Sequence, residues 1–322
     1  MLSIGQSFNT TGNLMRPTMT NSQHKRQPIK ADGAAPAVSV ILLTYNRADL
    51  LDAAIESILS QTMADFELII ADNASADRTS QVCQKWAAID SRIHYYRRPT
   101  NVGRTQNMNL GILASVGEYV AILHDDDVYD LDLLTEWKGL LDKYPDAAFV
   151  FNAYRALDAQ GETRTVHRAP LPLCSPGSAF LEGILFKRWR FDSPVRGTVM
   201  MRRRAIDQVG RFNERFESWS DVDMWMRLAE DFDVCYTDKP LITVRDAEVA
   251  PHQFADSIGH VQPLLERMFW DARMRHYHAR PIRRFNEAIR HWSFVAAARA
   301  WHFACAVNRK LRSMRRSESI CL

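Results

Sequence analysis

Cysteine is scarce in this chain, and its spacing excludes two common kinds of site. The 322 residues include 5 cysteines, an odd number, and no two of them have the spacing of a C-x-x-C motif. An odd set without paired spacing predicts neither a disulfide framework nor a structural zinc site. We therefore expect the chain to work in a reducing compartment, the cytoplasm.

Long apolar runs are also missing. Residues 1–36 are rich in Asn, Thr, Gln and Ser and lack the continuous apolar stretch that a secretory signal needs. We expect residues 1–36 to form a disordered lead-in. Near the other end, residues 288–307 are apolar, but two arginines and two histidines interrupt them, so they do not predict a membrane-spanning helix.

Charge is distributed unevenly along the chain. From Asp271 to the end there are 12 Lys and Arg against 3 acidic residues, a local charge of +9, which leaves −6 on the other 270 residues. We expect residues 251–322 to form a basic helical extension. It would pack on the rest of the chain or on a second subunit in a homo-oligomer, or residues 271–322 would lie on an anionic membrane surface at the inner face of the membrane. Nucleic-acid binding is the least expected of these uses.

The first half of the chain alternates between two hydrophobic patterns. Continuous apolar runs, typical of strands covered on both faces, alternate with stretches whose apolar residues recur at helical spacing. This alternation predicts an α/β protein with a mostly parallel central sheet between two layers of helices. The predicted strands are 38–44, 66–71, 93–96 and 119–124, and the predicted helices are 50–59, 76–88 and 105–115.

Polar side chains follow these strands, at the edge of the sheet where α/β proteins bind ligands. Asp72 can accept a hydrogen bond from the imide of a uracil ring, Tyr45 can form an aromatic wall, and Arg104 can bind diphosphate oxygens. Asn73 and Ser75 are instead typical of a turn or a helix cap. The sequence thus predicts a nucleotide site at this edge.

Three consecutive carboxylates, Asp125, Asp126 and Asp127, follow the predicted strand 119–124. Carboxylates this close repel one another, and a divalent cation with an anionic ligand of its own would neutralise them. The sequence therefore predicts a metal-bound diphosphate as their partner.

Several motifs, in their order along the chain, resemble those of family 2 glycosyltransferases with the GT-A fold, over roughly residues 37 to 245. The resemblance implies a nucleotide-sugar donor, for which we expect a UDP-linked sugar, an Mn²⁺ or Mg²⁺ ion held by an Asp-x-Asp element, and transfer with inversion. It also implies donor contacts at Thr44, Tyr45, Arg47, Asp72, Arg104, Asp125 and Asp126, and metal contacts at Asp125 and Asp127. Which of the three aspartates binds the metal directly stays open. The motifs are residues 38–47, 57–62, 66–73, 101–103 with Asn109 and Gly111, 117–120 and 125–127.

The segment Ser220–Ala229 resembles the acidic segment that begins a helix in the same family. Asp221 matches the aspartate that would take the proton from the acceptor hydroxyl, and the alternative is that it only caps the helix. Ser220 stands where a glutamate is usual. We expect Asp223 and Arg227, four residues apart, to form an ion pair within the helix, and Trp225 to lie in the core.

One departure from the family concerns the metal. Many members carry a histidine where this chain has Ala247, and His252 is a candidate replacement ligand five residues later.

The resemblance divides the main domain into a nucleotide-sugar half, 37–145, and an acceptor half, 146–250. We expect His124 and the loop 170–196 to shape the sugar pocket. The implied acceptor is a saccharide or a lipid-linked saccharide, in polysaccharide or cell-surface glycan synthesis. The alternatives are an inactive relative that binds nucleotide sugar or glycan, and a nucleotidyltransferase, which the absence of glycine from residues 44–48 disfavours.

Overall fold

A computed structural model describes residues 34–158, 161–185 and 194–245, with Met268, Phe269, Asp271, Ala272 and Arg275 beyond them. The expected disordered lead-in, apart from residues 34–36, and the expected replacement of a metal ligand missing at Ala247 by His252 fall outside the described residues.

The elements of the first half follow the predicted alternation. The strands and helices up to the acidic residues are β1 Val38–Thr44, α1 Ala48–Leu59, β2 Phe66–Asp72, α2 Thr79–Ile89, β3 Ile93–Arg97, α3 Arg104–Ala114 and β4 Tyr119–His124. After them come β5 Asp127–Tyr129, α4 Leu133–Lys143, β6 Ala147–Leu157, β7 Thr163–His167, β8 Cys174–Ser175, α5 Gly177–Leu185, β9 Val199–Arg202, α6 Arg203–Val209, the 3-10 helix η1 Glu214–Trp219, α7 Ser220–Asp231 and β10 Asp233–Val244.

A single sheet joins both halves of the domain. Its strand order is β3-β2-β1-β4-β9-β6-β10-β5, with β7 paired to β6 and β8 paired to β10. Strands β3, β2, β1 and β4 are parallel neighbours, and β6 and β10 are also parallel to each other. The short strand β9 lies antiparallel between β4 and β6. The expected α/β class with a mostly parallel sheet is confirmed.

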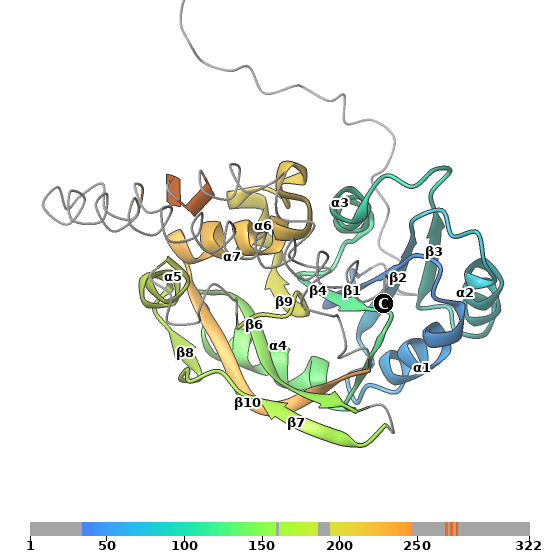
Figure 1. The fold of residues 1–322 in the computed structure, drawn as a ribbon, viewed down its shortest axis with the longest axis horizontal. Coiled ribbons are helices and arrows are strands. Elements are labelled where there is room, and N and C mark those ends of the chain that lie inside the picture. Colours follow the sequence, from blue (N-terminus) through green and yellow to red (C-terminus); the bar gives the residue numbers. More distant parts are fainter. Residues whose placement is uncertain are drawn as a thin grey trace, which may run out of the picture.

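Helices cover both faces of the sheet and give three layers (Figure 1). Because side chains alternate along a strand, β1 sends Val40 and Leu42 into one core and Ile41 into the other. Helices α1, α2 and α4 contribute to the first core, while α3, α5, α6 and α7 contribute to the second. Burial on both faces explains why the strands of the first half are continuous apolar runs.

The five described residues beyond the main domain are helical and pack on it. Met268 and Ala272 are buried in the same core as α7, and the guanidinium of Arg275 forms a salt bridge with Glu230 at 2.6 Å. This part of the expected extension therefore contacts the body of the chain. Among the residues that the structure describes, none of the helices is long and apolar enough to cross a bilayer.

Candidate functional site

The carboxyl ends of β1, β2 and β4 lie side by side and carry the predicted site. In the sheet register Thr44 is the partner of Asp72, and Leu43 is the partner of His124. The chain then turns through Asp125 and Asp126 before β5 begins. We call residues 125–127 the acidic turn.

The three aspartates of the acidic turn do not share one environment. Asp125 is buried beside Thr44, and neither the Thr44 hydroxyl nor Asp125 Oδ2 makes a hydrogen bond of ordinary geometry. Ligand atoms of Asp126, Asp127 and His124 lie within 4.8 Å of one another. The structure thus groups two of the aspartates with a histidine, and places Asp125 toward β1. A direct metal contact by Asp125 stays a prediction.

Burial makes two carboxylates of the acidic turn harder to ionise. It raises the pKa of Asp125 to about 6 and the pKa of Asp127 to about 7, and repulsion from Asp126 adds to both rises. Carboxylates with pKa values this high are costly to ionise in the folded chain. A buried carboxylate oxygen without a partner and a group of close ligand atoms fit a hard divalent cation, which prefers carboxylate oxygens.

His124 bears on which ligands are available to such an ion. Its Nε2 lies 3.1 Å from a terminal nitrogen of Arg104. A guanidinium only donates, so Nε2 accepts and the ring proton belongs on Nδ1, which faces Asp127 Oδ2 at 4.0 Å. Burial, and then the charges of Arg104 and Arg196, lower the pKa of His124 to about 3, so the ring is neutral. In this arrangement the carboxylates are the first ligands for a cation.

Arg245 holds the acidic turn in place, a role that the sequence analysis missed. Its guanidinium donates to the main-chain oxygens of Asp126 at 2.9 Å, Asp125 at 3.2 Å and Leu50 at 2.8 Å. These contacts tie the turn to α1, and the positive charge lowers the pKa of Asp127. An arginine at the end of β10 gives no local signal of this role, because its partners are about 120 and 195 residues away.

Substitution of Arg245 by glutamine should loosen the acidic turn. Three main-chain oxygens lose a charged donor, and Asp127 loses a neighbouring positive charge. We expect the free energy of unfolding to fall by about 1 to 3 kcal/mol. Urea denaturation measures the loss, and nucleoside diphosphate binding in Mn²⁺ should weaken in parallel. Arg204→Gln, at an exposed arginine of α6, is the matched control, and equal stability of the two variants would contradict the role of Arg245.

Asp72 is fully buried and already accepts three hydrogen bonds. Its Oδ1 accepts from the main-chain and side-chain donors of Ser75 at 2.8 and 2.6 Å, and its Oδ2 accepts from the Tyr95 hydroxyl at 2.6 Å. Asn73 binds Asn101 at 2.8 Å, which joins the loop after β2 to the loop before α3. Asn73 and Ser75 therefore stabilise the loop after β2, and neither caps α2, whose N-cap residue is Arg78. Donor contact by Asp72 stays a prediction.

The residues after β1 form the outer wall of the site. Tyr45 is 46% exposed, so its ring is available to a ligand. Asn46 has φ = 53°, and its Oδ1 accepts from the main-chain nitrogen of Ala76 at 2.7 Å. Arg47 is the N-cap residue of α1, and its charge lowers the pKa of Asp125. This segment therefore presents an aromatic ring and a cation next to the acidic turn.

A chain of contacts brings the start of α7 to the same edge. Ser220 Oγ lies 3.0 Å from Thr105 Oγ1 at the start of α3, and the preceding residue, Arg104, contacts His124. Asp221 is half-buried in the first turn of α7, where its Oδ1 lies 2.7 Å from the nitrogen of Val222. The helix dipole favours an ionised carboxylate at this end. These contacts link the start of α7 to the end of β4, and a single site that contains both Asp221 and the acidic turn stays a prediction.

Two other expectations for α7 are confirmed. Asp223 and Arg227 form an ion pair four residues apart, at 2.8 Å. Trp225 is fully buried and packs against Phe149 and Phe212, with ring centroids 5.1 and 5.9 Å away. Trp225 is therefore a core residue.

The turn before α7 contains an unusual backbone conformation. Glu217 has φ = 47° and ψ = −119°, a region that residues with a side chain rarely adopt, and its carbonyl accepts from the Thr105 hydroxyl at 3.1 Å. This turn directly precedes α7, whose second residue is Asp221.

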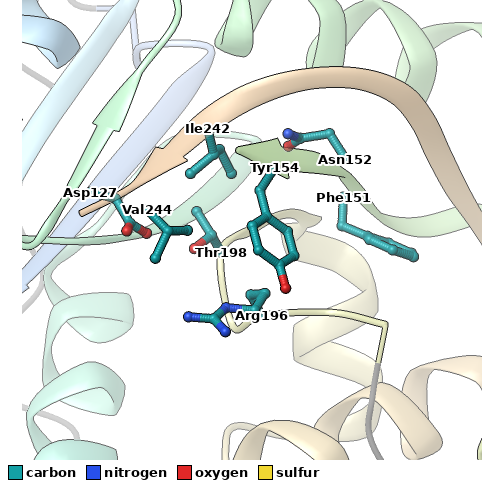
Figure 2. Close-up of a pocket in the computed structure, with 8 residues that line it drawn as sticks. All are labelled: Asp127, Phe151, Asn152, Tyr154, Arg196, Thr198, Ile242 and Val244. Carbon is teal, nitrogen blue, oxygen red and sulfur yellow. The ribbon is translucent and has the colours of Figure 1, made fainter. Parts of the chain in front are cut away.

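A small pocket lies beside Asp127 (Figure 2). Side chains from β6, β10 and the segment before β9 line it, and Arg196 and Tyr154 stand at its mouth. The loop 170–196 was expected to shape the sugar pocket, and Arg196 belongs to that loop, whereas Tyr154 and Thr198 were not predicted. Tyr154 lies 27 residues after Asp127 and Thr198 lies 23 residues before Asp221, so neither belongs to a predicted motif. The lining residues are Asp127, Phe151, Asn152, Tyr154, Arg196, Thr198, Ile242 and Val244.

Comparison with known sequences agrees with this arrangement. The model of glycosyl transferase family 2 matches residues 39–210, more than half of the chain. An uncharacterized glycosyltransferase of Rickettsia felis is 30% identical over 212 residues, which are 65% of this chain and 33% of that protein. The putative glycosyltransferase EpsE of Bacillus subtilis is 30% identical over 203 residues, 62% of this chain and 68% of EpsE. The aligned part is thus only about a third of the Rickettsia protein.

Solved structures show the same fold. Staphylococcus aureus TarS in complex with UDP has a TM-score of 0.57 and 19% identity, over 74% of this chain and 65% of that one. The mannosyltransferase PcManGT of Pyrobaculum calidifontis, in complex with GDP-Man and Mn²⁺, has a TM-score of 0.52 and 18% identity, over 80% of this chain and 68% of that one. The chain belongs to glycosyl transferase family 2 and has the GT-A fold.

Proposed function

We propose that this chain transfers a sugar, with inversion, from a nucleotide-sugar donor to a hydroxyl of a saccharide or lipid-linked acceptor. The observation that carries the proposal is the contact chain from Ser220 through Thr105 and Arg104 to His124. These contacts connect the start of α7, where Asp221 lies, with the end of β4, which leads into the acidic turn. Structures of relatives hold UDP, UDP-GlcNAc or GDP-Man, which supports this class of donor, and a UDP-linked sugar remains the first choice.

The cation in this proposal is Mn²⁺ or Mg²⁺, and Asp126 and Asp127 would hold it, with Asp125 close by. When bound, it would neutralise negative charge on the diphosphate. His124 is free to join only if its contact with Arg104 breaks. His252 and Ala247 lie outside the described residues, so a histidine ligand from that segment stays a prediction.

The side chains around the diphosphate have separate tasks. Arg47 and Arg104 would bind its oxygens and stabilise the charge that develops as the leaving group departs. Tyr45 would stack on the base, and Asp72 and Thr44 would contact the nucleoside. Together these contacts would hold the anomeric carbon of the sugar toward the start of α7.

Asp221 would act as the base. It would take the proton of the acceptor hydroxyl as the oxygen forms its bond to the anomeric carbon and the bond to the diphosphate breaks on the opposite face. One displacement with this geometry inverts the anomeric configuration. The proton remains on Asp221 and is released to water after the product leaves.

A binding module without activity is the second candidate. Ser220, next to Asp221, bonds to Thr105 and offers no second carboxylate at the start of α7. An enzyme that needs a Glu-Asp pair at this position would be inactive with this sequence.

The biological setting is also a proposal. One relative is the putative teichuronic acid biosynthesis glycosyltransferase TuaG of Bacillus subtilis, which is 32% identical over 126 residues, 39% of this chain and 50% of TuaG. A role in polysaccharide or cell-surface glycan synthesis, on the cytoplasmic side of a membrane, agrees with that relative. Contact of residues 271–322 with anionic lipid, and assembly as a homo-oligomer, remain proposals for the extension.

The decisive experiment follows the release of nucleoside diphosphate. The full chain is incubated with Mn²⁺ or Mg²⁺, a panel of UDP- and GDP-sugars and candidate saccharide acceptors. Melting-temperature shifts choose the donors, because a ligand of the native state raises stability. A transferase releases nucleoside diphosphate and forms a longer saccharide of inverted configuration. A second incubation supplies UTP or GTP with a sugar 1-phosphate, and release of pyrophosphate there would indicate a nucleotidyltransferase. Donor binding without any release in either incubation would indicate a binding module.

A further inference from the structure

The pocket beside Asp127 contains an arginine whose position is fixed by ring contacts. The Tyr154 ring stacks on the His167 ring with centroids 4.6 Å apart, and the Arg196 guanidinium lies 5.0 Å from the centroid of Tyr154. Tyr154 and His167 are direct partners in the β6–β7 ladder, so the sheet register holds the stack. A guanidinium stacked on a ring keeps its N–H groups available in its own plane.

Arg196 and Asp127 are the charged side chains that line this pocket. Across residues 34–158, 161–185 and 194–245 and the five beyond them, Arg196 forms no ion pair with a carboxylate. Its field reaches the acidic turn, where it lowers the pKa of Asp127 and of His124. A cation held against a ring at a pocket, without a direct salt bridge to a carboxylate among the described residues, is suited to an anionic ligand.

Thr198 supplies an independent observation in the same pocket. Its side chain lines the pocket and is 3% exposed, yet its hydroxyl has no hydrogen-bond partner. A buried hydroxyl without a partner is costly, by about 1 to 3 kcal/mol. A ligand oxygen that reached the pocket would satisfy Thr198 and Arg196 together.

The size of the pocket limits what can enter it. Its enclosed volume is about 10 Å³, room for about one water molecule, so a sugar ring does not fit inside. One oxygen of a substituent on a ring held above the pocket does fit, with the rest of that group outside it. Ile242 and Val244 form apolar walls that would exclude water from a charged contact there.

We propose that the pocket formed by Arg196, Thr198 and Tyr154 binds the carboxylate of an acidic sugar of the hexuronate class. Arg196 would hold the carboxylate through two parallel N–H donors, and the Thr198 hydroxyl would donate to one of its oxygens. A neutral hydroxyl in the pocket would give the Arg196 guanidinium no anionic partner in direct contact. The inference rests on the proposed function, since it assigns the substrate class of the same site.

The neighbouring Asp127 adds a condition. Its carboxylate also lines the pocket and repels a second carboxylate, unless a divalent cation at the acidic turn neutralises it. The preference for an acidic sugar should therefore be larger with Mn²⁺ than without it. A carboxylate bound only by Arg196 and remote from Asp127 would show no such dependence.

Titration calorimetry with matched ligand pairs tests the proposal on the full chain. The donor pairs are UDP-glucuronate with UDP-glucose and GDP-mannuronate with GDP-mannose, which differ only at C6. The acceptor pair is 4-nitrophenyl β-D-glucuronide with the matching glucoside, in the presence of UDP, GDP or neither, with Mn²⁺. We expect the acidic member of at least one pair to bind about 10- to 100-fold more tightly, as a charge-assisted pair does. The pair that responds tells whether the carboxylate belongs to the donor or to the acceptor.

Variants assign that preference to the pocket. Arg196→Gln should abolish it, Arg196→Lys should retain part of it, and Thr198→Val should reduce it several-fold while raising the melting temperature. Affinity for UDP or GDP alone should not change in any of them. Arg164→Gln, an exposed arginine on β7, should behave as the parent does.

Two results would overturn the inference. One is equal affinity for both members of every pair. The other is a loss of affinity for UDP or GDP in Arg196→Gln that is as large as its loss of affinity for the acidic ligand. That result would make Arg196 a diphosphate ligand. Neither result affects the proposed function, which fails instead if no nucleotide sugar is turned over. The binding preference is measurable in either case.

Discussion

Replacement of Asp221 by asparagine is expected to lower kcat by about 10²- to 10⁴-fold, the usual contribution of a positioned general base. Asparagine has the same shape but cannot take a proton at neutral pH. Its side-chain oxygen can still accept a hydrogen bond from the nitrogen of Val222, so α7 should begin at the same residue. Because binding of the nucleotide sugar does not require the base, the donor dissociation constant should change little.

Steady-state kinetics and a pH profile measure this effect. In the parent, kcat/KM should fall on the acid side as the base becomes protonated, and in Asp221→Asn this limb should disappear. Asp231→Asn, at the exposed end of the same helix, is the matched control and should retain full activity. The expected loss of folding stability is below about 1 kcal/mol, the size of a helix-dipole term.

Glu217 is the residue that would replace Asp221 in this role. It precedes α7 in the strained turn, three residues before Ser220. If Asp221→Asn keeps parental kcat while Glu217→Gln loses it, the base is Glu217. Loss in both variants would instead indicate that the turn positions Asp221, and comparison of KM with kcat would separate the two effects.

The strands of the central sheet could be predicted from the sequence because they are buried on both faces. Strand β1 spans Val38–Thr44 and β4 spans Tyr119–His124, as predicted, since a continuous apolar run has few other places in a soluble domain. Helix boundaries shifted more. The second helix was predicted from residue 76 but begins at Thr79, because Asp77 accepts from Thr79 and from Ala48 and so ends the loop later.

The acidic turn was predicted as a cluster, and its internal division was not. Sequence spacing treats Asp125, Asp126 and Asp127 as one group, but a chain that turns points successive side chains in different directions. Asp125 therefore faces Thr44, while Asp126 and Asp127 face His124. Only the path of the turn, fixed by Arg245, decides this, and that arginine is about 120 residues away.

Hydrophobic periodicity does not predict the pocket beside Asp127. It exists because β9 enters the sheet antiparallel between β4 and β6, which brings Thr198 and Arg196 next to Tyr154. Short strands such as β9, with four residues, carry almost no pattern. Pairings of this kind depend on long-range packing, so a single sequence gives no sign of them.

Replacement of Asp127 by asparagine should abolish activity and stabilise the ligand-free protein. Burial raises the pKa of Asp127 from 3.8 to about 7, so in the absence of a cation its ionised form weakens the fold. The folded chain holds this proton more tightly than the unfolded chain. The associated stability is therefore present at low pH and is lost as the pH rises through about 7. Asparagine carries no charge to bury, so the variant escapes this loss.

The size of the gain follows from the shift. One pKa unit corresponds to about 1.4 kcal/mol, so the rise from 3.8 to about 7 sets an upper bound of about 4 kcal/mol. Local relaxation reduces this, and we expect the variant to be more stable by about 1 to 3 kcal/mol at pH 8. The difference should shrink toward pH 5, where Asp127 is protonated in the folded parent. Thermal unfolding at both pH values, without metal or nucleotide, measures it.

The same variant should lose function because it loses a carboxylate at the proposed cation site. We expect kcat/KM to fall by about 10²- to 10³-fold, as when one group that stabilises transition-state charge is removed. Mn²⁺ with UDP or GDP should raise the melting temperature of the parent and leave that of the variant nearly unchanged. Asp238→Asn, at an exposed aspartate of β10, should match the parent in every measurement. If the variant melts below the parent at pH 8, Asp127 stabilises the ligand-free fold. The prediction that its ionised form destabilises the fold until a cation binds would then be wrong.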